Sequence, residues 1–175
     1  PEPIITPSTK AAQGEHDESV APSELYKRGV VDPGLYKELA RISMKLYERG
    51  VARAADHGMI FVDTKYEFGI SNGKIMLMDE VNTPDSSRYW IKDDYESRFE
   101  KGEEPRKLDK EYVRTWLSEQ GFTGEGTPPK LTDDIRVEAS ARYMEVVEKF
   151  TGEPMQLDVG PVDESIYSIL NPFAY

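Results

Sequence analysis

Acidic and basic side chains alternate along one segment near the middle of the chain. Asp63, Lys65 and Glu67 occupy every second position, so on an extended strand they share one face. Asp79 and Glu80 end the next apolar run, which follows a turn signal. Carboxylates on adjacent strands can hold a hard divalent cation through oxygen, and a nearby lysine can bind the phosphates or carboxylates that such a cation neutralises. The pattern therefore indicates a cation-dependent site for an anionic ligand.

The same alternation also has a simpler interpretation. Charged residues at every second position of an antiparallel strand are typical of a sheet face that is exposed to solvent. The loop that follows adds an acid, two hydroxyls and a guanidinium within residues 85–88. The pattern alone leaves the functional and the solvated interpretations open.

Composition narrows the classes of function. The chain has 175 residues, one domain's worth, and its 22 basic and 33 acidic side chains give a net charge of −11. This acidity disfavours binding to nucleic acid or to an anionic membrane surface. Without cysteine and with two histidines, the sequence excludes thiolate chemistry and a site built from several histidines. No apolar run approaches the roughly 20 residues that span a bilayer. Catalysis would therefore use carboxylates, Lys and Arg with a hard cation.

Hydrophobic periodicity predicts an α+β fold, in which an antiparallel sheet containing a hairpin is packed by long helices. Asp32 is predicted to cap a long helix that a break at Gly50 could interrupt. Asp109 and Thr132 are predicted to cap two later helices. The expected elements are a short helix from residue 22, helices over 33–56, 110–120 and 133–151, strands over 59–68 and 74–81, a loop over 82–90, an aperiodic segment over 91–107, and a tail over 153–175.

Four segments together resemble one enzyme family. Residues 62–69 resemble the D-x-K-x-E-F-G signature of the SAICAR synthetases, the phosphoribosylaminoimidazole-succinocarboxamide synthases of purine biosynthesis. Residues 79–90 resemble the family's D-E-x-x-T-P-D-S-S-R-[FY]-W segment. Residues 6–18 resemble T-P-S-T-K…G-E-H-D-E, and residues 109–117 resemble D-K-Q-F-V-R-x-W-L, with departures at Glu111 and Tyr112. The resemblance covers about residues 1–152.

The resemblance implies that the chain is the carboxyl-terminal lobe of a two-lobe, α/β-type cytoplasmic ligase. Residues 1–152 would form that lobe, and residues 153–175 would form an extended tail without a counterpart. Nothing in the sequence matches the family's amino-terminal lobe, which covers the ATP phosphates and is needed for the full site. The chain alone is therefore expected to be inactive.

The resemblance also implies a reaction. ATP would convert the carboxylate of carboxyaminoimidazole ribonucleotide into an acyl phosphate, and the amine of L-aspartate would displace the phosphate, giving SAICAR, ADP and phosphate. Such a reaction depends on alignment and charge neutralisation more than on a protein nucleophile. Mg²⁺ is the implied cofactor and ATP the co-substrate. A non-catalytic acidic module that binds a divalent cation or a nucleotide is the alternative.

Roles for individual residues follow from the resemblance. Glu67 and Asp79 match the family's magnesium ligands. Lys65 is expected to steady a phosphate or the reacting carboxylate, Asp63 to position Lys65 or the ribose, and Asp85 to accept from the aminoimidazole amine. Arg88 is expected to bind the 5′-phosphate. The other implied substrate-binding residues are Ser86, Ser87, Lys110, Arg114, Lys10, His16 and Asp17.

The hairpin allows a geometric prediction. A two-residue Asn72-Gly73 turn would pair Glu67 with Met78 and place Asp79 on the opposite face. A metal site shared by both carboxylates therefore predicts a three-residue, bulged turn that includes Ser71. Apolar side chains along the hairpin are expected to be exposed in the absence of the other lobe, which would favour self-association.

Overall fold

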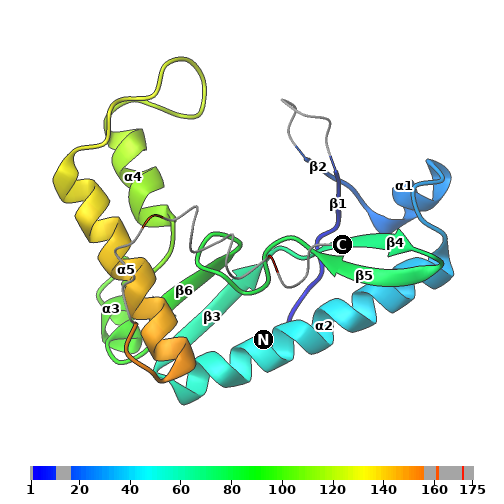
Figure 1. Cartoon of the computed structure of the whole chain (residues 1–175), viewed down its shortest axis with the longest axis horizontal. Helices are drawn as coiled ribbons and strands as arrows, with labels where there is room; N and C mark the ends of the chain where they lie inside the picture. Colours follow the sequence, from blue (N-terminus) through cyan, green and yellow to red (C-terminus); the bar gives the residue numbers. More distant parts are fainter. Residues whose placement is uncertain (1, 11–16, 156–160, 162–170, 172–175) are drawn as a thin grey trace.

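The structure, a computed structural model, describes residues 2–10, 17–155, 161 and 171, and it confirms the α+β fold class. Two-stranded antiparallel sheets lie along one side of a long helix, α2 (Figure 1). The elements in chain order are β1 (Ser8–Thr9), β2 (Glu18–Ser19), α1 (Pro22–Lys27), α2 (Pro33–Asp56), β3 (Met59–Thr64), β4 (Glu67–Ser71), β5 (Lys74–Met78), β6 (Ser87–Ile91), α3 (Tyr95–Glu100), α4 (Glu111–Glu119) and α5 (Asp133–Thr151).

The long helices begin and end where the sequence predicts. Asp32 Oδ1 accepts hydrogen bonds from the backbone N–H groups of Gly34 and Leu35, at 2.8 and 3.0 Å, and so caps α2. Thr132 Oγ1 accepts from the third residue of α5, and Gly152 ends that helix with a φ of 79°. Most of the predicted tail lies outside the described residues. No helix in the described part of the chain is both long and apolar enough to cross a membrane.

The core forms where α2, the β3–β6 sheet and α5 meet. Tyr89 of β6 is completely buried between Phe61 of β3 and Phe150 of α5, with ring centroids 5.0 and 6.0 Å away. Arg53 of α2 donates to the last carbonyls of α5 and ties the two helices together. The buried members of the core are Ala54, Met59, Phe61, Tyr89, Ile91, Leu108 and Val146. This core fixes β6, which carries part of the predicted site.

Gly50 does not break α2, which runs through it without interruption. A Cβ at this position would lie 2.8 Å from Phe61 Cε1 and 3.1 Å from Asn82 Nδ2. The glycine therefore lets the core ring and the loop after β5 approach the helix backbone closely.

We predict that Gly50→Ala destabilises the protein, although alanine is the better helix former. The gain of about 1 kcal/mol in helix propensity is smaller than an overpacking cost of up to about 3 kcal/mol. Denaturant unfolding measures the difference, and the control is Val51→Ala, a change at an exposed neighbour that should alter stability by less than about 0.5 kcal/mol. A more stable Gly50→Ala protein would contradict the packing argument.

The predicted strand over residues 59–68 is two strands with different partners. β3 pairs with β6, and β4 pairs with β5, so the chain changes partner at residues 65–66. The expected loop over 82–90 is accordingly wrong at its end, because residues 87–91 form β6. Every second residue of β6, namely Ser87, Tyr89 and Ile91, is buried against the core. The aperiodic segment also contains the short helix α3, which the sequence analysis did not predict.

The predicted three-residue hairpin turn is wrong. Ser71 pairs with Lys74, which leaves a two-residue turn in which Asn72 and Gly73 have φ of 50° and 72°. Asn and Gly tolerate these left-handed conformations, so the turn matches the strand twist without a bulge. Glu67 pairs with Met78, and the next residue, Asp79, has a φ of 63° and lies beyond the end of β5. Alternation along the ladder therefore no longer determines where Asp79 points.

Candidate functional site

Four charged side chains from two distant parts of the chain form a cluster of ion pairs centred on Glu67. Glu67 begins β4, and its Oε2 lies 2.5 Å from Nζ of Lys10, which directly follows β1. Its Oε1 lies 2.7 Å from Nζ of Lys65, which in turn lies 3.3 Å from Oδ2 of Asp17. The β1–β2 pair thus brings two residues of the first motif to the D-x-K-x-E motif, which is nearly 50 positions further along the chain. His16, predicted for the same site, lies outside the described residues.

The charges in this cluster stabilise one another. Lys10, and then Lys65, hold the pKa of the Glu67 carboxyl below its usual value, although partial burial opposes the shift. Glu67 in turn raises the pKa of Lys65, with a smaller contribution from Asp17. Both shifts favour the charged forms of Glu67 and Lys65.

We predict that Lys10→Met raises the pKa of Glu67 and makes stability less sensitive to acid. A carboxyl with a lowered pKa contributes stability above about pH 4.5, and this contribution is lost as the pH falls through the folded-state pKa. The wild-type chain should therefore lose more stability than the variant as the pH falls below 4.5. An NMR titration of the Glu67 side chain measures the pKa. Lys27→Met, which removes an exposed lysine beside Glu24, should leave the pKa of Glu67 unchanged.

Glu67 also suits a hard cation. Its Oε1 is buried and makes no hydrogen bond of good geometry, although Lys65 Nζ is close enough for an ion pair. A carboxylate oxygen in this state has a lone pair to offer Mg²⁺. The second predicted ligand, Asp79, is exposed at the end of β5. Among the described residues, no group of three or more His, Asp or Glu side chains is arranged to hold a metal, so a site shared by Glu67 and Asp79 stays a prediction.

Arg88 and Asp63 form a direct cross-strand pair that the sequence analysis missed. Their backbones are opposite one another in the β3–β6 ladder, and the guanidinium donates to both carboxylate oxygens from Nε, at 2.9 and 3.0 Å, and again from Nη2. A bulge between Phe61 and Asp63 brings the two residues into register. The carboxylate raises the pKa of Arg88. Recognising residues 87–91 as a strand would have revealed the pair.

The serines of the following loop hold the loop together. Ser87 is buried, and its hydroxyl donates to Thr64 Oγ1 at 2.8 Å. Ser86 donates from its backbone N–H to Thr83 Oγ1, and its own Oγ accepts from the backbone N–H of Thr83. Thr83 also donates its hydroxyl to Glu80. These hydroxyls, predicted to contact substrate, already have partners within the loop and on β3.

Two tyrosines of the neighbouring strands and connection also hold this loop through Asn82, and the sequence analysis missed both contacts. Tyr89 donates its hydroxyl to the carbonyl of Asn82 at 2.5 Å, and Tyr66 donates to Asn82 Oδ1 at 2.8 Å. Burial raises the pKa of Tyr66 to about 12, so its hydroxyl stays protonated as a donor. Asn82 has a φ of 59°, a conformation that this residue tolerates better than most others do.

The amino-terminal end of α4 faces the loop. Lys110 Nζ lies 3.2 Å from Oδ1 of Asp85, and Arg114 pairs with Glu111 within the helix. Asp109, which directly precedes Lys110, accepts from the backbone N–H of Tyr89, and this contact places the start of α4 near β6. The structure therefore brings Asp85, Arg88 and Lys110 to one region, and their binding to substrate stays a prediction.

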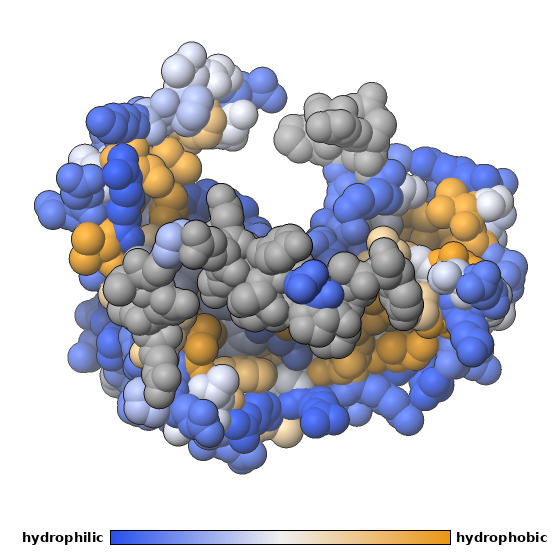
Figure 2. Space-filling model, viewed as in Figure 1, coloured by the Kyte–Doolittle hydropathy of each residue, from blue (hydrophilic) through white to orange (hydrophobic). Residues whose placement is uncertain are grey.

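The apolar side chains of the hairpin are exposed, as predicted. Gly69, Met76 and Met78 share the hairpin face that carries Glu67, because Glu67 pairs with Met78 and Gly69 with Met76. Half of the surface of each methionine is exposed, and a Cβ on Gly69 would collide with the sulfur of Met78. Hydrophobic side chains gather in Figure 2 over the hairpin and along α2. Exposed apolar side chains thus lie on the hairpin face that also carries Glu67.

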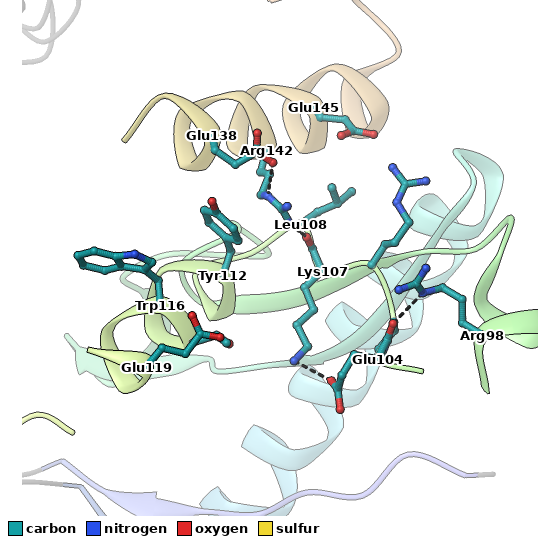
Figure 3. A pocket seen from close by; sticks show the side chains of 13 residues that line it. Arg98, Glu104, Lys107, Leu108, Tyr112, Trp116, Glu119, Glu138, Arg142 and Glu145 are labelled. Carbon is teal, nitrogen blue, oxygen red and sulfur yellow. Dashed lines mark hydrogen bonds and ion pairs between the residues drawn. The ribbon is translucent and has the colours of Figure 1, made fainter. Parts of the chain in front are cut away.

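A cavity of about 520 Å³ lies on another part of the molecule, between α4, α5 and residues 104–108 (Figure 3). Arg142 crosses it, donating to Glu138 at 2.8 Å and to the carbonyl of Lys107 at 2.6 Å, with its guanidinium 4.1 Å from the centre of the Tyr112 ring. None of the predicted site residues lines this cavity. Its charged groups join α4 to α5 and to the segment before α4.

Comparison with known proteins identifies the same family as the motifs do. The model of the SAICAR synthetase family matches residues 1–130, about three quarters of the chain. The chain belongs to the SAICAR synthetase family. The phosphoribosylaminoimidazole-succinocarboxamide synthase of Bacteroides thetaiotaomicron is 50% identical over 155 residues, which are 87% of this chain and 49% of that protein. The chain thus spans about half the length of the curated relatives it matches.

Solved structures of this family share the fold. The SAICAR synthase of Saccharomyces cerevisiae, in complex with SAICAR, superposes with a TM-score of 0.71 at 36% identity, over 90% of this chain and 49% of that one. A type-2 SAICAR synthetase in complex with ADP gives a TM-score of 0.64 at 27% identity, over 90% of this chain and 54% of that one. The similarity therefore extends over most of this chain and about half of each relative.

Proposed function

We propose that this chain supplies part of the active site of an ATP-dependent ligase in the cytoplasm, which joins L-aspartate to carboxyaminoimidazole ribonucleotide. The observation that carries the proposal is the Glu67 carboxylate held by Lys10 and Lys65, because a carboxylate suits a cation and the two ammonium groups beside it suit a phosphate. Relatives solved with SAICAR and with ADP support the two classes of ligand. Family membership does not favour a non-catalytic module.

The reaction must make a carboxylate reactive toward an amine. In the proposed reaction, the γ-phosphoryl group of ATP is transferred to an oxygen of the ribonucleotide carboxylate, and ADP leaves. The aspartate amine then attacks the carbonyl carbon of the acyl phosphate, which expels phosphate and leaves an amide after loss of a proton. Charge neutralisation and alignment are the main requirements of phosphoryl transfer, and the lysines of this site suit both.

Glu67 and Asp79 would hold Mg²⁺, which would neutralise charge on the ATP phosphates. Lys65 lies within ion-pair distance of Glu67, so it can contact a phosphate or carboxylate held near that residue. The hairpin face of Gly69, Met76 and Met78 continues from Glu67, and its two methionines are exposed, so it offers an apolar surface that suits a purine base. The cofactor and the base would thus occupy adjacent parts of one hairpin face.

The ribonucleotide would bind between β6 and α4. Arg88 offers a planar guanidinium suited to a phosphate, and Lys110 and Arg114 add positive charge from the helix. Asp85 lies beside Lys110 and would accept a hydrogen bond from the aminoimidazole amine. Lys10 and Asp17 would contact substrate from the β1–β2 side. Ser86 and Ser87 would act chiefly by shaping the loop, since the Ser86 hydroxyl accepts from the backbone N–H of Thr83 and the Ser87 hydroxyl donates to Thr64 of β3.

We predict that Glu67→Gln and Asp79→Asn abolish turnover when the ligase is assembled. The assay would combine this chain with the remaining portion of the B. thetaiotaomicron relative and measure SAICAR formation from the three substrates. Each variant removes a negative charge at the cation site, so we expect a loss of at least about 100-fold. Asp134→Asn, on the first turn of α5, is the control and should keep full activity. Turnover that survives both site substitutions would refute the proposed magnesium ligands.

We predict that Arg88→Lys weakens binding of carboxyaminoimidazole ribonucleotide to the chain by about tenfold or more, because lysine cannot form the two parallel hydrogen bonds of a guanidinium. Isothermal titration calorimetry measures the dissociation constant. Arg136→Lys, at an exposed residue of α5, is the control. Equal affinity in the wild type and the Arg88→Lys variant would show that Arg88 does not bind the ribonucleotide.

A further inference from the structure

Asp109 is the most deeply buried acidic side chain among the described residues, with 1% of its surface exposed. Its Oδ2 accepts from the backbone N–H of Tyr89 at 3.0 Å, and its Oδ1 accepts from the backbone N–H of Glu111 at 2.9 Å. One carboxylate therefore links the middle of β6 to the first residue of α4. Burial raises the pKa of Asp109, whereas the two N–H groups and Arg88 act in the opposite direction.

Every polar group of Tyr89 is hydrogen-bonded, two of them to the residues that directly precede α4. Its N–H donates to Asp109, its carbonyl accepts from Leu108 at 2.9 Å, and its hydroxyl donates to Asn82. Tyr89 directly follows Arg88, so the attachment fixes the backbone from which the guanidinium projects. Residues 106–108 thereby lie alongside β6 as a third extended segment, joined through the Trp90–Lys107 bridge.

The start of α4, which Asp109 joins to β6, carries two further basic residues. Lys110 follows Asp109 directly, and Arg114 lies one helical turn further on. Arg142 holds the opposite side of α4 through the Tyr112 ring and the carbonyl of Lys107, as Figure 3 shows for the labelled residues. Residues 106–108 already pair with β6, and Asp109 adds the side-chain link that joins β6 to the first backbone N–H of α4.

We propose that Asp109 is a positioning residue for anion recognition: it sets the separation between Arg88 on β6 and Lys110 and Arg114 at α4. The proposal rests on the proposed function, because it assumes that these cations bind one ribonucleotide. Asp109 itself does not touch the ligand. Its two hydrogen bonds fix the span between Arg88 and the cations of α4, and a ligand with separated anionic groups would have to fit that span.

The test compares Asp109→Ala and Asp109→Asn in the whole chain, with carboxyaminoimidazole ribonucleotide as the probe in calorimetry. We expect binding to weaken at least about tenfold in the alanine variant, because a misplacement of about 1 Å is costly at such sites. Asparagine can accept one of the two hydrogen bonds and should restore part of the affinity. Met59→Ala is the control for stability, because Met59 is a buried core residue at the start of β3 and its side chain makes none of the hydrogen bonds of Asp109.

A merely structural role predicts a different result. In that case, affinity measured well below the unfolding temperature would be unchanged in both Asp109 variants, or would fall equally in the Met59→Ala control, and either result would overturn the proposal. If Arg88→Lys also left affinity unchanged, or if the wild-type chain did not bind the ribonucleotide, the proposed function would fail on separate grounds.

A second measurement tests the separation without any ligand. Because the sequence contains no cysteine, cysteines introduced at the exposed Lys92 and Ser118 can be spin-labelled as a unique pair. Electron–electron double resonance then reports the distance between the end of β6 and α4. We expect a shifted or broader distance distribution in Asp109→Ala, a smaller change in Asp109→Asn and none in Met59→Ala. An unchanged distribution in Asp109→Ala would overturn the proposal even if the ribonucleotide does not bind.

Discussion

The ion-pair cluster around Glu67 is the constraint on which the candidate site depends. A carboxylate with a partly buried oxygen is stable there because two ammonium groups lie within 2.7 Å of it. One of those groups comes from the β1–β2 segment and the other from the connection between β3 and β4. The same contacts that stabilise the charge therefore bring together segments that the sheets alone would leave separate.

A second constraint is the attachment of the loop over residues 82–86 to the core. Tyr89 places an aromatic ring in the centre of the core and a hydroxyl beneath the loop, so burial of apolar area and loop geometry are linked through one side chain. Gly50 allows Phe61 and Asn82 to approach α2, and the serine and threonine hydroxyls close the loop from its other side. The loop is thus held by its contacts with the core and by hydrogen bonds between its own residues. Such a fixed loop suits a site in which the reacting groups must be aligned.

Local chemistry made part of this structure predictable from the sequence. The caps at Asp32 and Thr132 and the terminal Gly152 act within a few residues, so α2 and α5 could be predicted almost to their ends. The change of partner between β3 and β4 could not, because it depends on where β6 pairs. The Asp63–Arg88 contact depends on that pairing and on a bulge, so it was missed as well. The motifs predicted which segments would form the site, and this stays a prediction, whereas the hydrogen bonds of Asp109 and Tyr89 required coordinates.

The pairing of Arg88 with Asp63 bears on how such a site would distinguish its ligand from the many small anions in a cell. The chain as a whole is strongly negative, so at long range it repels phosphate and nucleotides alike. A guanidinium that is already neutralised by a neighbouring carboxylate offers little to a lone inorganic ion, which would have to compete with that carboxylate. A larger ligand that meets several cations at once gains enough contacts to replace the internal partner. Selectivity would then arise from simultaneous engagement rather than from the strength of any one charge.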